Sequence, residues 1–112
     1  MQAIIVKVLP CTNTKPTRLK AYCERGSITL SRSECGDGGA DLQACEALKR
    51  LVSKFLLEDW RKYGSPPAKN PWRGPWVQGY DPHVGWVHTN QTWKGAYTRI
   101  DTIDGKFVEG FK

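Results

Sequence analysis

One segment in the middle of the chain constrains the fold more than any other, because it has the pattern of a single long amphipathic helix. Asp41 is placed to cap the start of this helix, which we expect to run over residues 41–62. Gly64-Ser65-Pro66-Pro67 predicts its end, since proline lacks the amide donor. Apolar side chains recur at spacings of three and four along one stripe, namely Cys45, Leu48, Val52, Phe55 and Leu56. This stripe should face a sheet.

The residues before the helix predict that sheet. Residues 2–9 are rich in β-branched side chains, and residues 18–24 alternate between apolar and polar. Arg25-Gly26 supplies a tight turn, after which residues 27–31 return as a third strand. We therefore predict a three-stranded antiparallel meander over residues 1–35, packed on the helix.

The residues after the helix are harder to assign. The stretch 64–82 combines Pro71, Gly74, Pro75, Gly79 and Pro82 with aromatic residues, so we expect an irregular loop there. Residues 84–112 predict short strands, at 84–88, 94–101 and 106–111, with Asp104-Gly105 as the turn of a C-terminal hairpin. The expected fold is α+β, formed by residues 1–112 as a single domain.

Charge is the most unusual bulk property of the chain. The 112 residues carry a net charge of +6, concentrated in residues 1–33 and 60–80. Such a surplus favours acidic or polyanionic partners, although many basic domains bind no nucleic acid. The sequence shows neither a signal-peptide layout nor the roughly 18–20 apolar residues of a bilayer span, so we expect a cytoplasmic protein with no membrane partner.

The chemistry-bearing residues argue against catalysis and against a metal or other cofactor. Cys11, Cys23, Cys35 and Cys45 include no CxxC pair, whereas zinc sites usually draw two thiolates from one tight turn. A metal site stays an alternative to structural thiols. His83 and His88 lie in no catalytic signature, so a small hydrolase using either histidine is a third-ranked hypothesis.

Two surfaces are candidates for binding. The first is the outer face of the meander, with Lys7, Arg18, Lys20 and Tyr22, joined at its ends by Lys15 and Arg25. Cations beside an aromatic ring on an open sheet suit phosphates and a stacked base. The alternative is a solvated sheet face that needs no partner.

The second surface is the aromatic segment between residues 60 and 80. Its candidate contacts are Trp72, Arg73, Trp76 and Tyr80, residue types enriched at interface hot spots. Tryptophans in a small domain also pack over the core, and we expect this of Trp60 and one other tryptophan.

The opening of the chain resembles a known group of proteins. Residues 2–9, followed by Thr12-Asn13-Thr14-Lys15-Pro16-Thr17-Arg18-Leu19-Lys20-Ala21, look like the start of small accessory proteins encoded by tailed bacteriophages. The resemblance covers about half of the chain, to the helix at Asp41, and the sequence departs from the pattern after Pro66.

The resemblance implies a non-enzymatic phage protein inside a bacterial host, where it occupies a host protein. Inhibitors of CRISPR immunity are one class of this kind. The leading hypothesis is therefore a binding module that blocks a host protein or a nucleoprotein complex, such as a CRISPR effector. The alternative is direct nucleic-acid binding through the same basic and aromatic residues, and the oligomeric state is left open.

Overall fold

The computed structural model describes residues 3–14, 16–35, 38–64, 70–89 and 98–100. Its strands are β1 (Ala3–Leu9), β2 (Arg18–Tyr22), β3 (Ser27–Ser31), β4 (Trp76–Asp81), β5 (Gly85–Thr89) and β6 (Thr98–Ile100). The helix α1 spans Ala40–Tyr63, and the short 3-10 helices are η1 (Arg32–Cys35) and η3 (Pro71–Arg73). The predicted α+β class is confirmed.

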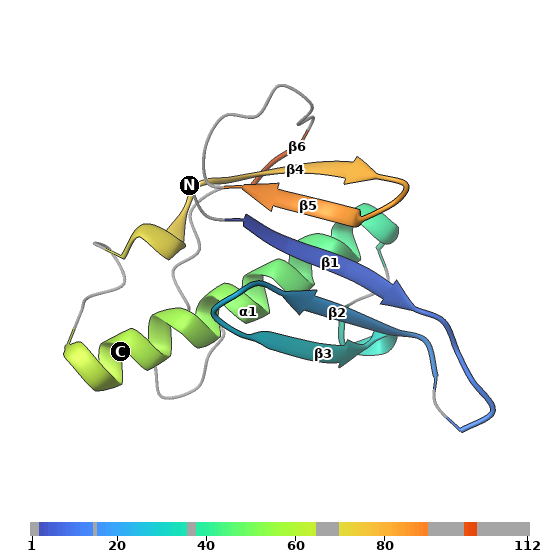
Figure 1. The fold of residues 1–112 in the computed structure, drawn as a ribbon, viewed down its shortest axis with the longest axis horizontal. Coiled ribbons are helices and arrows are strands. Elements are labelled where there is room, and N and C mark those ends of the chain that lie inside the picture. The colour runs from blue at the N-terminus through green and yellow to red at the C-terminus, as the bar shows by residue number, and fades with distance from the viewer. Residues whose placement is uncertain (1–2, 15, 36–37, 65–69, 90–97, 101–112) are drawn as a thin grey trace.

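These six strands form one sheet in the order β3-β2-β1-β5-β4-β6, and every neighbouring pair is antiparallel. The predicted meander is present as β1, β2 and β3. β1 joins it to the β4–β5 hairpin, because Ile5 pairs with Tyr22 on one side and with Val87 on the other. Figure 1 shows this sheet in front of α1, which crosses behind it at an angle.

The expectation of an irregular loop over residues 64–82 is wrong for its last part, which is β4. The prolines at 71, 75 and 82 all lie outside Trp76–Asp81, so they interrupt no ladder hydrogen bond. Gly79 lies inside the strand, buried and paired with Val87. The predicted strand at 84–88 corresponds to β5, and β6 lies within the predicted 94–101. The Asp104-Gly105 hairpin lies outside the described residues.

The helix has the predicted extent within a residue or two, but its start differs from the expectation. Gly39 is the N-cap and makes no side-chain cap bond, so the predicted capping role of Asp41 is wrong. Asp41 lies instead within the first turn, where its carboxylate complements the positive end of the helix. At the other end, Gly64 adopts the left-handed conformation, with φ of 67°, and its amide bonds to the Trp60 carbonyl.

The core lies between α1 and one face of the sheet. Most of the predicted helical stripe is buried, and Cys45 is half-buried. The strands bury their alternate residues against it, including Ile4, Val6, Leu19 and Ala21. β4 adds Trp76, the largest fully buried side chain in the described part of the chain.

A small polar network sits inside this core. Oε1 of Gln78 lies 2.5 Å from Nε2 of His88 and accepts a hydrogen bond from the Cys45 thiol at 3.1 Å. Nε2 of Gln78 donates to the Asp41 carbonyl at 3.3 Å, so the network ties β4 to the first turns of α1. Burial lowers the pKa of His88 to about 4, which makes the ring neutral at pH 7.

One helix cannot cover both faces of a six-stranded sheet, so the face away from α1 has no helical layer in the described part of the chain. We call this the open face; its residues on β1, β2 and β3 include Ile5, Lys7, Arg18, Lys20, Tyr22 and Thr29. No helix among the described residues has the length and apolarity needed to cross a bilayer.

We predict that stability falls as the pH drops from 6.5 toward 4. In this window His88 is protonated in the unfolded chain but stays neutral in the folded protein, where its pKa is about 4. Protonation therefore favours unfolding. Near pH 4 the free energy of unfolding should have fallen by about 3 kcal/mol, because each unit of difference between the unfolded and folded pKa is worth about 1.4 kcal/mol. Urea unfolding across this range measures it. His88→Gln should flatten the curve, and an equally steep fall in that variant would contradict the assignment.

Candidate functional site

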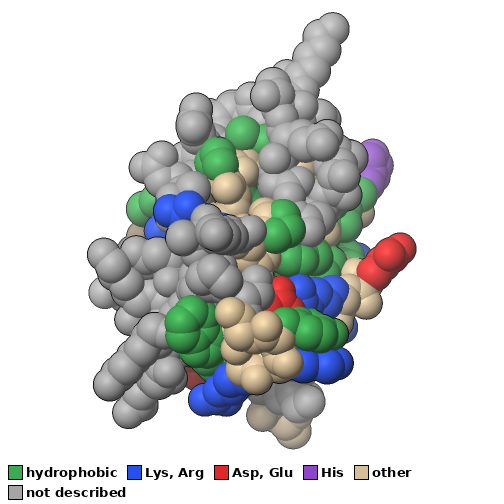
Figure 2. All heavy atoms as spheres, turned by 90° about the vertical axis from the view of Figure 1, so that its left-hand side faces the viewer, with side chains coloured by type: hydrophobic (Ala, Val, Ile, Leu, Met, Phe, Trp, Pro, Cys, Tyr) green, Lys and Arg blue, Asp and Glu red, His purple; other side chains and the backbone are tan. Residues whose placement is uncertain are grey.

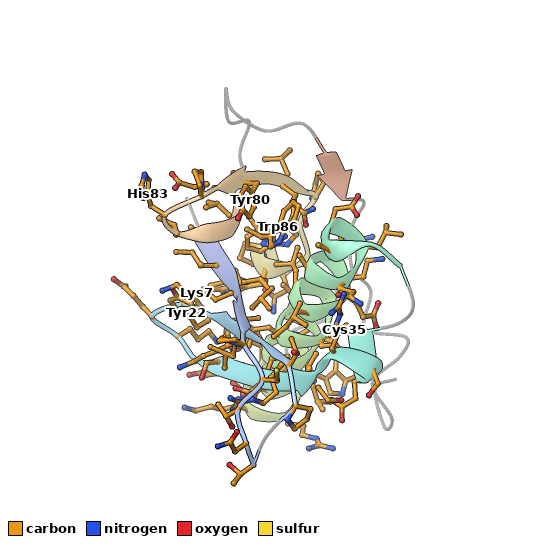
Figure 3. All side chains as sticks on the ribbon, turned by 90° about the vertical axis from the view of Figure 1, so that its right-hand side faces the viewer. Lys7, Tyr22, Cys35, Tyr80, His83 and Trp86 are labelled. Carbon is orange, nitrogen blue, oxygen red and sulfur yellow. The ribbon has the colours of Figure 1, made fainter. Side chains whose placement is uncertain are left out.

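The open face brings together three of the residues predicted for the first surface. Lys7 on β1 lies directly opposite Lys20 on β2, and Tyr22 follows two residues later on the same face. The Nζ atoms of both lysines lie 5.7 Å from the centroid of the Tyr22 ring. Figure 3 shows Lys7 and Tyr22 together on the side of the sheet away from α1. The sequence alternation placed this group correctly.

The two lysines form an uncompensated pair of positive charges. Like charges directly opposite one another on neighbouring strands destabilise a sheet. Within the described ranges, no carboxylate lies within ion-pair distance of either ammonium group, and both residues are exposed. The contact with the Tyr22 ring offsets part of the repulsion, since an aromatic face attracts a cation. An anion bound between the two lysines would offset the remaining repulsion.

Two further cations of the first surface were expected at its margin. Arg18 is on the same face as Lys20 and donates from Nε to the Pro16 carbonyl at 3.3 Å. Its pairing with Leu9 continues the open face beyond the lysine pair. Lys15 lies outside the described residues.

Arg25 does not belong to the open face, and its predicted place there is wrong. Its guanidinium turns toward α1 and donates to both carboxylate oxygens of Asp59, at 2.6 and 3.2 Å, and to the Phe55 carbonyl at 3.2 Å. It also lies 4.5 Å above the Phe55 ring and 5.6 Å from the Trp72 ring. Arg25 thus fastens the β2–β3 turn to the helix.

Asp59 is the centre of this structural cluster. Besides Arg25, its carboxylate accepts from Nδ2 of Asn70 at 2.7 Å, and Oδ1 of Asn70 accepts from the Trp72 amide at 3.0 Å. The hydrogen bonds from Arg25 lower the pKa of Asp59, and the same contact raises the pKa of Arg25. Three segments far apart in sequence therefore meet at one carboxylate.

Most of the predicted second surface is part of this scaffold. Trp72 is half-buried and packs edge-on against Phe55, with 4.9 Å between centroids. Trp76 is 0% exposed and donates from Nε1 to the Trp72 carbonyl at 2.9 Å, so its predicted role as a surface contact is wrong. Arg73 is half-buried beside them. These rings fill the space between α1 and β4.

Some aromatic residues of the second surface remain accessible. Trp60, which we expected in the core, is 37% exposed. Tyr63 is 70% exposed, and Lys62 places its Nζ 5.3 Å from the Tyr63 ring centroid. Seen from the end where α1 terminates, hydrophobic and basic side chains lie side by side (Figure 2). Tyr80, at 50% exposed, lies away from this end, on β4.

The sequence analysis missed Trp86 as a possible contact. It lies directly opposite Tyr80 in the β4–β5 hairpin, and the two rings meet edge to face at 4.9 Å. The signal was present in the sequence, because Asp81 and Gly85 bracket a Pro-containing turn that places residues 80 and 86 in register. Because residues 64–82 were interpreted as a loop, the pairing of Tyr80 with Trp86 was not predicted.

The remaining histidines and cysteines do not converge. His88 is buried within the polar network, and His83 is exposed in the β4–β5 turn. Burial raises the pKa of the Cys35 and Cys45 thiols, which favours the neutral form of each. Across the described residues, no group of three or more His, Cys, Asp or Glu side chains is placed to hold a metal ion.

Comparison of the chain with protein-family models, with curated proteins and with solved structures produced no match in any of the three.

We predict that Asp59→Ala destabilises the protein by about 1–3 kcal/mol, since it leaves the partly buried donors of Arg25 and Asn70 without their acceptor. Urea unfolding measures the change. Glu46→Ala is the matched control, because it removes a carboxylate from an exposed pair with Arg50 on the same helix. That variant should lose only about 0.3–0.5 kcal/mol. Equal losses in the two variants would contradict a central role for Asp59.

Proposed function

We propose that the protein is a binding domain whose open face takes single-stranded nucleic acid. The observation that carries this proposal is the lysine pair, Lys7 opposite Lys20, which has no carboxylate partner among the described residues. A phosphate group between the two ammonium groups would neutralise the repulsion and gain charge-assisted hydrogen bonds.

Tyr22 supports a single strand as the ligand. Its ring is half-exposed on the open face, beside both lysines. An aromatic ring can stack on a base only when that base is unstacked from its own helix, as in single strands, loops and ends. Cations that track the backbone beside an aromatic platform are the usual arrangement for this kind of binding.

The open sheet provides a suitable shape. A sheet face that no helix of the described residues covers admits an extended chain across β1 and β2, and Arg18 continues the positive charge along β2. The protein's net charge of +6 would also accelerate encounter with a polyanion.

A protein or nucleoprotein partner is the second candidate, favoured by the exposed cluster of Trp60, Lys62 and Tyr63 at the end of α1. Aromatic side chains beside cations are typical of interface hot spots. Under this hypothesis the protein would block a host complex, as inhibitors of CRISPR immunity do, and binding would persist after nuclease treatment. The phage-type role stays a prediction.

We predict that replacing both lysines, Lys7→Ala with Lys20→Ala, weakens binding to a single-stranded oligonucleotide at least about tenfold, because two charge-assisted hydrogen bonds to phosphate are removed. Fluorescence anisotropy over a range of salt concentrations measures it. The slope of log affinity against log salt should flatten by about 0.7 for each phosphate that the variant no longer neutralises.

The matched control is Lys49→Ala with Lys54→Ala, which removes the same charge from α1, on the other side of the sheet. It should change the affinity little and leave the salt slope nearly intact. Equal weakening by the two double variants would mean that net charge alone drives binding, and the open face would lose its assigned role.

A further inference from the structure

A pocket of about 240 Å³ lies where β1 and the β4–β5 hairpin separate. Its lining includes Lys7 and Val8 from β1, Tyr80 from β4, His83 from the turn, and Gly85 and Trp86 from β5. Figure 3, which views the molecule from the hairpin end, shows Tyr80 and Trp86 on the helix side of the sheet and Lys7 on the open side. Because Lys7 also lines it, the pocket reaches the open face at that residue. We call it the hairpin pocket.

The backbone creates this pocket by a close approach that only glycine permits. β5 pairs with β1 as far as Val6 and Trp86, and the next residue toward the turn is Gly85, with φ of 114°. A Cβ atom on Gly85 would lie 2.7 Å from the Val6 carbonyl oxygen and 3.5 Å from Cγ of Lys7. Gly85 therefore allows the turn to approach the end of β1 closely, and this approach forms one edge of the pocket.

The turn that forms one wall is held in place by Asp81. Its Oδ1 accepts from the His83 amide at 2.7 Å and from the Val84 amide at 3.3 Å. Because these amides engage the Asp81 carboxylate, its charge is partly satisfied within the turn. The wall is therefore defined by local hydrogen bonds.

The walls are apolar and accessible. Tyr80 is 50% exposed and Val8 is 51% exposed, both at the pocket, and Trp86 supports Tyr80 edge to face. A volume of about 240 Å³ falls below the ~300–1,000 Å³ usual for a drug-sized ligand. The occupant is therefore about the size of one planar ring system.

Charge at the pocket selects among such ring systems. Lys7 contributes to both the hairpin pocket and the lysine pair on the open face, so a ring in the pocket lies next to a site for an anion. A nucleotide combines a flat aromatic base with a phosphate on one backbone. An unmodified aromatic side chain of a protein carries no such anion.

We propose that the hairpin pocket receives one base of the strand whose phosphates lie on Lys7 and Lys20. Tyr80 and Trp86 provide the aromatic walls, and Lys7 joins the base site to the backbone site. This inference rests on the proposed function of the open face and adds a second base contact to that of Tyr22.

The test measures binding of two strands of about ten nucleotides, within the ~4–16 nucleotide range of known single-strand sites. One strand is oligothymidylate, and the other has the same length but abasic sugars throughout, which preserves the phosphates. Tyr80→Leu removes the aromatic face while keeping an apolar side chain, and Tyr80→Phe is the matched control that keeps the ring.

Tyr80→Leu should weaken binding of oligothymidylate about tenfold and leave binding of the abasic strand unchanged. Tyr80→Phe should bind both strands as the unaltered protein does. Val8→Glu provides a second variant at an exposed position of the pocket. Its added charge affects both strands, so the ratio of the two affinities isolates the base contact, and this ratio should fall.

The outcomes separate the two proposals. If Tyr80→Leu and Val8→Glu both keep the ratio of the unaltered protein, the hairpin pocket holds no base, while the open face remains the site for the strand. If the unaltered protein binds neither strand, the proposed function fails and the pocket inference fails with it. Capture of a protein partner that is lost in Tyr80→Leu would likewise overturn the pocket's assigned ligand.

Discussion

The whole arrangement depends on one constraint, which is that a single helix provides the second layer for a six-stranded sheet. A helix of 24 residues is about 36 Å long but only about 10 Å wide, whereas six strands span roughly 24 Å from the first axis to the last. The helix therefore crosses one face at an angle and leaves the other without a helical partner in the described part of the chain. The open face lies where α1 provides no cover (Figure 1).

The Asp59 cluster explains why so many aromatic residues are unavailable for binding. A narrow helix contacts the sheet along a limited strip, so additional groups must close the gap between α1, the β2–β3 turn and β4. Arg25, Trp72 and Trp76 close it. Asp59 accepts from Arg25 directly and is linked to Trp72 through Asn70, and Trp76 donates to the Trp72 carbonyl. Residue types that suggest an interface in the sequence thus belong to the scaffold. Among the described residues, exposed or half-exposed aromatic side chains lie on β2, on β4 and at the end of α1.

Particular elements show which parts of the fold could be predicted from local patterns. The helix and the meander were predictable because their apolar periodicities are long and regular. β4 was not, because glycines and prolines cluster around a short strand, and only its partner β5 shows that Gly79 fits inside a ladder. In the candidate site, alternation alone put Lys7, Lys20 and Tyr22 on one face. It could not identify Trp86 as a neighbour of Tyr80 once the preceding strand had been interpreted as a loop.

The sequence by itself determined the helix, the strands of the meander and the side of each of these strands to which a residue belongs, since these follow from backbone geometry that repeats every two or 3.6 residues. Only the tertiary structure decided that β1 pairs with β5, that Arg25 turns to Asp59 and that Trp76 is buried. The physical reason is that pairing and burial are set by contacts between residues 30 or more positions apart, such as Arg25 with Asp59. No local repeat in the chain specifies those contacts.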